Sequence, residues 1–190
     1  MKIGITGNYG CGKSTVTKIF EQEFSFKAIY ADEIAHPLYL PEKPAYGRII
    51  EIFGEEILKP DRSIDRKRFS DKAFSDENLL RKVNEIMWPE MRAEIEKKLL
   101  YSGSRTALEA AVLFEAGWNY LVDKVILVYA DEEVLLRRIK DSGRDIEKAK
   151  KILKAQMPQE KKRELSDYVI DNSHSIEKTR EQVYEIWNKI

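Results

Sequence analysis

Short runs of apolar residues alternate with longer amphipathic stretches along this chain of 190 residues. Apolar residues at alternate positions, or in short unbroken runs, predict five β-strands. Apolar residues spaced three and four positions apart predict the helices between them, and this alternation is typical of an α/β fold with a parallel sheet. The predicted strands are Lys2–Thr6, Phe26–Ala31, Arg105–Leu108, Asp123–Ala130 and Asp167–Asp171.

The stretch between the second and third strands is the longest helical part of the chain. Its apolar spacing predicts helices over Glu33–Leu38, Ala45–Phe53 and Asp65–Phe74, and then a long helix that Pro89 kinks or restarts. This much helix exceeds a single crossover between parallel strands and predicts a subdomain beside the sheet. We therefore expect one domain over 1–190, with a core of 1–34, 104–140 and 166–190 and a helical subdomain of 35–103.

Composition narrows the classes of protein that fit. Apolar residues make up 43% of the chain, which supports a packed core, and 33 basic residues balance 33 acidic ones. Bulk charge therefore indicates neither a nucleic-acid nor a membrane partner. The first strand begins at once, without a signal peptide, and the single cysteine, Cys11, suits a reducing compartment. We expect a cytoplasmic protein, and the sequence leaves its oligomeric state open.

A phosphate-binding loop follows the first strand. Residues Gly7 to Ser14 form the pattern Gly-x4-Gly-Lys-Ser, and an amphipathic helix follows them. Glycines let the backbone N–H groups turn toward a polyphosphate, Lys13 can reach its β- and γ-phosphates, and Ser14 can bind Mg²⁺. Cys11 is most simply a tolerated filler within this loop. The predicted nucleotide contacts are Asn8, Tyr9, Gly10, Cys11, Gly12, Lys13, Ser14 and Thr15.

Charged residues follow several of the other strands. Asp32 comes just after the second strand, at the sheet edge where ligands bind in parallel sheets, although it could instead be the N-cap of the next helix. Glu109 falls at the carboxyl end of the third strand. Arg137, Arg138 and Arg144 can supply the cations that phosphoryl transfer requires. The lysines of the Lys-rich stretch 148–162 are expected to form a solvated helix face.

Missing motifs limit the choice among phosphate-loop proteins. The chain has neither the Asp-x-x-Gly nor the Asn-Lys-x-Asp pattern of Ras-like GTPases, and no clear Walker B strand ending in aspartate. A carboxylate after the second strand, a helical insertion and late arginines fit a kinase that closes a lid over two substrates. A kinase for another small acceptor, such as a nucleotide or nucleoside, and a non-catalytic nucleotide-binding protein remain alternatives.

The chain resembles the dephospho-coenzyme A kinase family over nearly its whole length. The resemblance implies a three-layer P-loop kinase fold with a lid at 141–165, and phosphorylation of the ribose 3′-hydroxyl of dephospho-CoA by ATP with Mg²⁺. It assigns the catalytic carboxylate to Asp32 and the ATP base region to Asn172. The matching segments are Ile3–Thr15, Ile29–Ala35, Phe53–Gly54, Ile64–Arg66, Leu113–Glu115, Gln156 and Ser166–Asn172.

The chain departs from the family pattern at four places, one of which is the run Ala111-Val112-Leu113-Phe114-Glu115, where the family has Pro-Leu-Leu-Phe-Glu. Tyr30 stands where the family has the first aspartate of its Asp-Ala-Asp segment, and Trp88 stands where the family has the histidine of its His-Pro element. Asp141 occupies the position of a family lid arginine. If the lid works similarly, Arg138 or Arg144 takes over that arginine's role, and we expect both to be catalytic together with Asp32 and Lys13.

Overall fold

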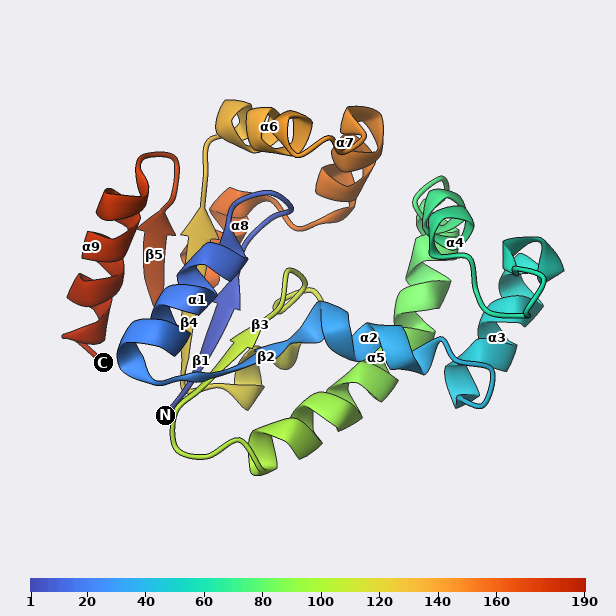
Figure 1. Ribbon diagram of the computed structural model, residues 1–190, viewed down its shortest axis with the longest axis horizontal. Helices are drawn as coiled ribbons and strands as arrows, with labels where there is room; N and C mark the ends of the chain where they lie inside the picture. Colours follow the sequence, from blue (N-terminus) through green and yellow to red (C-terminus); the bar gives the residue numbers. More distant parts are fainter. The chain divides into compact units, whose positions relative to one another are not determined.

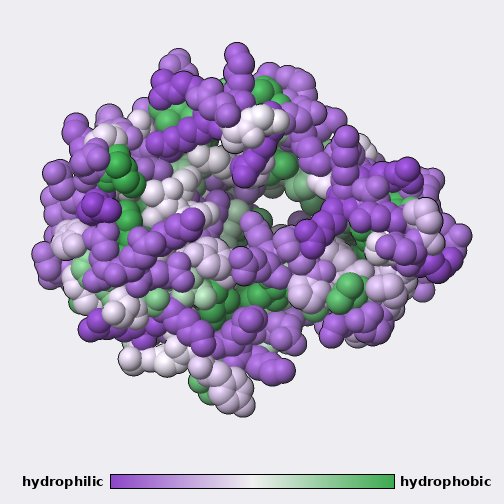
Figure 2. Space-filling model, in the orientation of Figure 1, coloured by the Kyte–Doolittle hydropathy of each residue, from purple (hydrophilic) through white to green (hydrophobic).

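The computed structural model describes all residues from 1 to 190, and these form two compact units. The first unit combines Met1–Tyr30 with Lys98–Ile190, and the second is Ala31–Lys97. None of the helices is both long enough and apolar enough to cross a lipid bilayer. Hydrophilic residues dominate the face seen in Figure 2, with hydrophobic residues scattered among them.

A five-stranded parallel sheet forms the centre of the first unit (Figure 1). Its strand order is β2-β3-β1-β4-β5, so β1 lies in the middle and the loop after β1 leaves from the centre of the carboxyl edge. The α/β class, the parallel sheet and all five predicted strands are confirmed to within a residue or so at each end. The strands are β1 Lys2–Thr6, β2 Lys27–Tyr30, β3 Thr106–Glu109, β4 Lys124–Tyr129 and β5 Tyr168–Asp171.

Helices cover both faces of this sheet, which explains why its central strands are apolar on both sides. In Figure 1, α1 and α9 lie in front of the sheet and α8 lies behind it. The ring of Phe24 in α1 packs at a tilt of 37° against Trp187 of α9, with ring centroids 5.1 Å apart. The helices of this unit are α1 Lys13–Phe24, η2 Trp118–Leu121, α6 Glu132–Asp141, α7 Ile146–Ala155, α8 Gln159–Leu165 and α9 Ile176–Trp187.

The second unit is entirely helical. Its helix α4 begins where the Asp65 carboxylate accepts hydrogen bonds from the N–H groups of Lys67 and Arg68, which satisfies two otherwise unpaired donors. Phe69 of α4 packs edge to face on Phe53, with ring centroids 5.1 Å apart. The elements are α2 Ala31–Leu38, α3 Pro44–Phe53, η1 Glu55–Ile57, α4 Arg66–Ala73 and α5 Glu77–Leu100, whose last residues belong to the first unit.

Pro89 lies inside α5, which runs unbroken from Glu77 to Leu100. The ribbon in Figure 1 changes direction along this helix. A proline removes one backbone hydrogen bond and its ring crowds the preceding turn, which is enough to bend a long helix without ending it. Of the two predicted outcomes at Pro89, the kink is therefore correct and the restart is wrong.

Candidate active site

The loop between β1 and α1 has a backbone that strongly favours glycine at three positions. Gly7 has φ +147°, Gly10 has φ +84° and Gly12 has φ +93°. A Cβ atom on Gly7 would lie 2.2 Å from the carbonyl oxygen of Val128, and one on Gly12 would lie 2.1 Å from Nδ2 of Asn172. The loop is therefore held tightly against β4 and against the residue that follows β5.

Helix α1 starts at Lys13 with no side-chain cap. Its first N–H groups, together with the positive end of the helix dipole, make this point favourable for an anion. The Lys13 ammonium folds back over the loop and donates hydrogen bonds to the carbonyl oxygens of Gly7, at 3.0 Å, and Asn8, at 3.3 Å. A movable cation thus lies beside an uncapped helix N-terminus, which is what binding of a polyphosphate requires.

Ser14 and Glu109 bring two oxygen atoms together beside this loop. The Ser14 hydroxyl donates a hydrogen bond of 3.1 Å to Oε1 of Glu109. Glu109 is the last residue of β3 and is buried, with 9% of its surface exposed. Sequence reasoning left Glu109 without a role because it sought an aspartate after a longer apolar strand. Glu109 could have been recognised as a site residue from its place in the sequence, because it is a carboxylate at the end of β3, the strand that pairs with β1.

Asn172 and Arg138 both support the loop at the carbonyl oxygen of Cys11. Nδ2 of Asn172 donates to this oxygen at 2.7 Å, and a guanidinium nitrogen of Arg138 donates to it at 3.4 Å. Oδ1 of Asn172 accepts a hydrogen bond of 2.7 Å from the Thr179 hydroxyl. The side chain of Asn172 therefore braces the loop with both its nitrogen and its oxygen, and it also lines a cavity.

This cavity has a volume of about 240 Å³ and lies next to the start of α1. Arg138 of α6 lines it on one side, and His174 and Ile176, which follow β5, line it on another. The remaining lining residues are Gly12, Thr15 and Asn172. Sequence reasoning missed His174 and Ile176, because a lone histidine and isoleucine after a strand carry no pattern of their own.

The Cys11 side chain is completely buried beneath the loop. Burial raises the pKa of its thiol, which therefore stays protonated and unreactive at neutral pH. This environment agrees with the interpretation of Cys11 as a filler of the loop.

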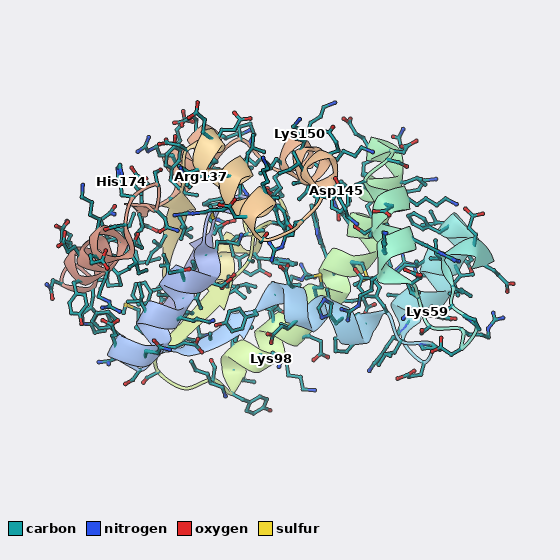
Figure 3. The ribbon with its side chains drawn as sticks, turned by 45° about the horizontal axis from the view of Figure 1, so that its top comes forward. Lys59, Lys98, Arg137, Asp145, Lys150 and His174 are labelled. Atoms are coloured by element: carbon teal, nitrogen blue, oxygen red, sulfur yellow. The ribbon has the colours of Figure 1, made fainter.

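Arg144 and Gln156 meet the loop at Tyr9. The guanidinium carbon of Arg144 lies 5.4 Å from the centre of the Tyr9 ring, and Oε1 of Gln156 accepts a hydrogen bond of 2.9 Å from the Tyr9 N–H. Figure 3 shows the crowd of charged side chains on α6 and α7, among them Arg137 and Lys150. Arg137 is exposed. The structure thus brings both predicted catalytic arginines, Arg138 and Arg144, to the loop.

Lys162 corrects the prediction of a solvated lysine face. It is fully buried, and its ammonium donates to the carbonyl oxygen of Ala111 at 2.6 Å and lies 3.0 Å from Oε1 of Glu115. The same Glu115 oxygen accepts the N–H of Met157 at 2.9 Å. Burial lowers the pKa of Lys162, and the Glu115 carboxylate opposes this shift. Charge patterning could not separate this lysine from its exposed neighbours because its partner lies far away in the sequence.

Asp32 belongs to the second unit and is exposed. It is the second residue of α2, which begins at Ala31 directly after β2, so the alternative that Asp32 is the N-cap is wrong. Burial raises the pKa of Tyr39 to about 12, and the Asp32 carboxylate adds to this shift while Arg66 opposes it. Asp32, Tyr39 and Arg66 therefore form one electrostatically connected group.

Tyr30 takes a local structural role at the end of β2. Its hydroxyl donates a hydrogen bond of 2.8 Å to Oε2 of Glu21 in α1. This contact ties β2 to the helix that follows the phosphate-binding loop.

Comparison with known proteins shows the family to which the chain belongs. The family model described as dephospho-CoA kinase matches residues 1–178. The chain is 41% identical to the dephospho-CoA kinase of Aquifex aeolicus, covering 100% of this chain and 97% of the relative, and 42% identical to that of Carboxydothermus hydrogenoformans, covering 98% and 93%.

Solved structures give the same family and the same fold. The dephospho-CoA kinase of Campylobacter jejuni is 28% identical, with a TM-score of 0.69 and coverage of 100% of this chain and 97% of that one. A shikimate kinase of Bacteroides thetaiotaomicron, 16% identical with a TM-score of 0.59 and coverage of 99% and 98%, shares the fold alone. The chain therefore belongs to the dephospho-CoA kinase family, and its reaction, phosphorylation of dephospho-CoA by ATP, is the final step of coenzyme A biosynthesis.

Proposed function

We propose that the loop Asn8–Thr15 holds the triphosphate of ATP and that Asp32 activates the ribose 3′-hydroxyl of dephospho-CoA for attack on the γ-phosphate. The observation that carries the proposal is the Lys13 ammonium, which rests on the loop's own carbonyl oxygens beside an uncapped helix N-terminus. An arriving polyphosphate offers this ammonium a stronger, charged acceptor. Catalysis then consists mainly of positioning and charge neutralisation.

Ser14 and Glu109 suit Mg²⁺. Both offer oxygen atoms, which this ion prefers, and the two lie within one hydrogen bond of each other. The structure contains no cluster of three or more His, Cys, Asp or Glu residues able to hold a metal, but Mg²⁺ bound with a nucleotide needs only one or two protein groups. Mg²⁺ held there would supply neutralisation of the charge on the phosphate oxygens. Ser14 and Glu109 would hold it at the start of α1.

The cavity beside the loop suits the adenine of ATP. It opens next to Gly12 and Thr15, where the nucleoside end of a triphosphate bound along the loop would project. Arg138 and His174 provide flat polar side chains and Ile176 an apolar one, a combination that fits an aromatic base. Asn172 supports this region by fixing the Cys11 carbonyl.

Asp32 is the proposed base, and the helical segment 35–103 is the proposed acceptor subdomain. Asp32 follows β2 by two residues, and β2 ends at the carboxyl edge of the sheet, the edge where β1 enters the loop. The charges of Arg66 and Asp32 both act on Tyr39. Arg66 is therefore a cation in the same group as Asp32, and it suits a phosphate group of the acceptor. The exposure of Asp32 leaves its carboxylate accessible to a hydroxyl.

Lys13, Arg138 and Arg144 are the proposed cations for the transferred phosphoryl group. Arg138 reaches the Cys11 carbonyl and Arg144 rests on Tyr9, so both start from positions at the loop. An arginine at a transferring phosphoryl group is worth about 10³ to 10⁵ in rate. The proposed lid is the region 141–165, which carries Arg144 and contains α7 and α8.

Turnover measured with ATP and a panel of acceptors tests the proposal. Dephospho-CoA is expected to react, and nucleosides and nucleoside monophosphates are expected to react poorly. Lys13→Ala should lose turnover and bind ATP more weakly, while Lys18→Ala, at an exposed lysine further along the same helix, serves as the matched control. Faster phosphorylation of a nucleotide than of dephospho-CoA, or normal turnover by Lys13→Ala, would contradict the proposal.

A further inference from the structure

Tyr9 touches residues at both ends of α7. Arg144 precedes this helix by two residues, and its guanidinium carbon lies 5.4 Å from the centre of the Tyr9 ring. Gln156 follows the helix directly, and its Oε1 accepts the Tyr9 N–H at 2.9 Å. Tyr9 therefore contacts one residue just before α7 and one residue just after it.

The next two loop residues, Gly10 and Cys11, contact helix α6. A Cβ atom on Gly10 would lie 3.0 Å from the Ile139 side chain, so the loop backbone rests directly on that side chain. The Cys11 carbonyl accepts a hydrogen bond from Arg138. Three consecutive loop residues therefore contact α6 or the residues that flank α7, and the two helices can be found in Figure 3 by the labels Arg137, in α6, and Lys150, in α7.

The side chain of Tyr9 is not needed to hold a polyphosphate, because a phosphate-binding loop does so with its backbone N–H groups. Its aromatic face is therefore available to a cation. Arg144 is exposed, and an arginine side chain has many rotamers to lose when it is fixed at a substrate. A ring beneath its guanidinium restricts the positions it can take, which lowers the entropic cost of placing it at a substrate.

We propose that Tyr9 is a positioning residue of the phosphoryl-transfer reaction, holding Arg144 over the phosphate-binding loop by a cation–π contact while its N–H holds the far end of α7 through Gln156. The part that concerns Arg144 rests on the role proposed above for that arginine. The link between Tyr9 and α7 does not depend on it.

The test compares Tyr9→Leu, which removes the ring and keeps the backbone N–H, with Tyr9→Phe, which keeps a ring. Since a cation–π contact at an exposed site contributes about 0.5 to 1 kcal/mol, we expect Tyr9→Leu to lower kcat by about two- to fivefold. The KM for dephospho-CoA should not change, and Tyr9→Phe should restore most of the lost kcat. The matched control is Tyr101→Leu, at a surface tyrosine that is 75% exposed. Equal losses in the two Tyr9 variants, or no loss in Tyr9→Leu, would overturn the proposal.

Two further measurements separate this proposal from the role of Arg144. In an Arg144→Met background, Tyr9→Leu should cause no additional loss of kcat. If it lowered kcat there as much as it does when Arg144 is present, the contact between Tyr9 and Arg144 would not be the cause of the loss. Normal turnover by Arg144→Met alone would remove Arg144 from the reaction. Amide hydrogen exchange at the start of α7 should still be faster in Tyr9→Leu than in Tyr9→Phe, and identical exchange would overturn the contact between the ring and Arg144. Both variants keep the Tyr9 N–H, so Gln156→Leu, which removes its acceptor, tests the link to the far end of α7: exchange there should be faster than in the unsubstituted protein, and unchanged exchange would overturn the link.

Discussion

The Ser14 hydroxyl, in the first turn of α1, donates a 3.1 Å hydrogen bond to the Glu109 carboxylate at the end of β3. The two residues are far apart in the sequence, and the parallel pairing of β1 with β3 brings them together. This contact places a buried carboxylate directly behind the hydroxyl that a phosphate-binding loop offers to Mg²⁺.

Glu109→Gln should raise the Mg²⁺ concentration that the reaction needs. The amide keeps the shape of the side chain but removes its charge, and loss of a supporting group around a metal commonly costs about 10- to 100-fold in affinity or activity. A Mg²⁺ titration of kcat should therefore shift to higher concentration. Glu109→Asp, which keeps the charge, should shift it less. An unchanged Mg²⁺ dependence in Glu109→Gln would separate Glu109 from the metal.

Gly12→Ala should abolish ATP binding. The new Cβ atom would lie 2.1 Å from Nδ2 of Asn172, at a φ of +93° that side chains rarely adopt, so the brace between Asn172 and the loop must break. Isothermal titration with ATP measures the loss. The matched control is Gly47→Ala, in α3 with open space around it, which should bind ATP normally and gain about 0.5 to 1 kcal/mol in stability. Normal ATP affinity in Gly12→Ala would refute the packing described for this position.

Lys162→Met should destabilise the fold. Removing one partner of a buried ion pair leaves the Glu115 charge uncompensated and costs about 3 to 5 kcal/mol in the free energy of unfolding. Chemical denaturation measures this loss. Lys161→Met, at the exposed neighbouring residue, is the matched control and should be near neutral.

The double variant Lys162→Met with Glu115→Gln should recover part of that stability. A neutral amide at position 115 needs no charged partner and can still accept the Met157 N–H. A double variant no more stable than Lys162→Met alone would argue against the uncompensated charge as the cause.

Tyr39 should make the second unit sensitive to alkali. Burial raises its pKa to about 12 in the folded protein, whereas an unfolded tyrosine has a pKa near 10. Between these values the folded state retains a proton that the unfolded state has lost, so stability falls as the pH rises. The difference from Tyr39→Phe should reach about 2 kcal/mol by pH 12. Denaturation curves from pH 9 to 12 measure it, and equal slopes for the two proteins would show that Tyr39 ionises as it does when unfolded.

Much of the fold could be predicted from the sequence, because strands and the phosphate-binding loop are each marked by a residue pattern within a short segment. Alternating apolar residues located all five strands, and the motif from Gly7 to Ser14 located the phosphate-binding loop. The cytoplasmic location and the absence of nucleic-acid and membrane partners stay predictions from composition.

Long-range contacts were beyond the sequence patterns. Glu109 joins Ser14 through strand pairing, and Lys162 joins Glu115 through the packing of α8 behind the sheet. Neither partner can be identified from the sequence, because helical and strand periodicity relate only residues that are close together along the chain. The position of Arg144 on Tyr9 depends on the path of the chain through α6 and α7, which helical propensity alone does not determine.

The most direct test of the proposed mechanism is the turnover of dephospho-CoA by Asp32→Asn, with ATP affinity measured on the same protein. The amide keeps the size of the side chain and removes the base, and a general base is worth about 10² to 10⁴ in rate. We expect kcat to fall by that factor while the dissociation constant for ATP, set by the loop in the other unit, stays the same. Near-normal turnover by Asp32→Asn would contradict the role assigned to this carboxylate.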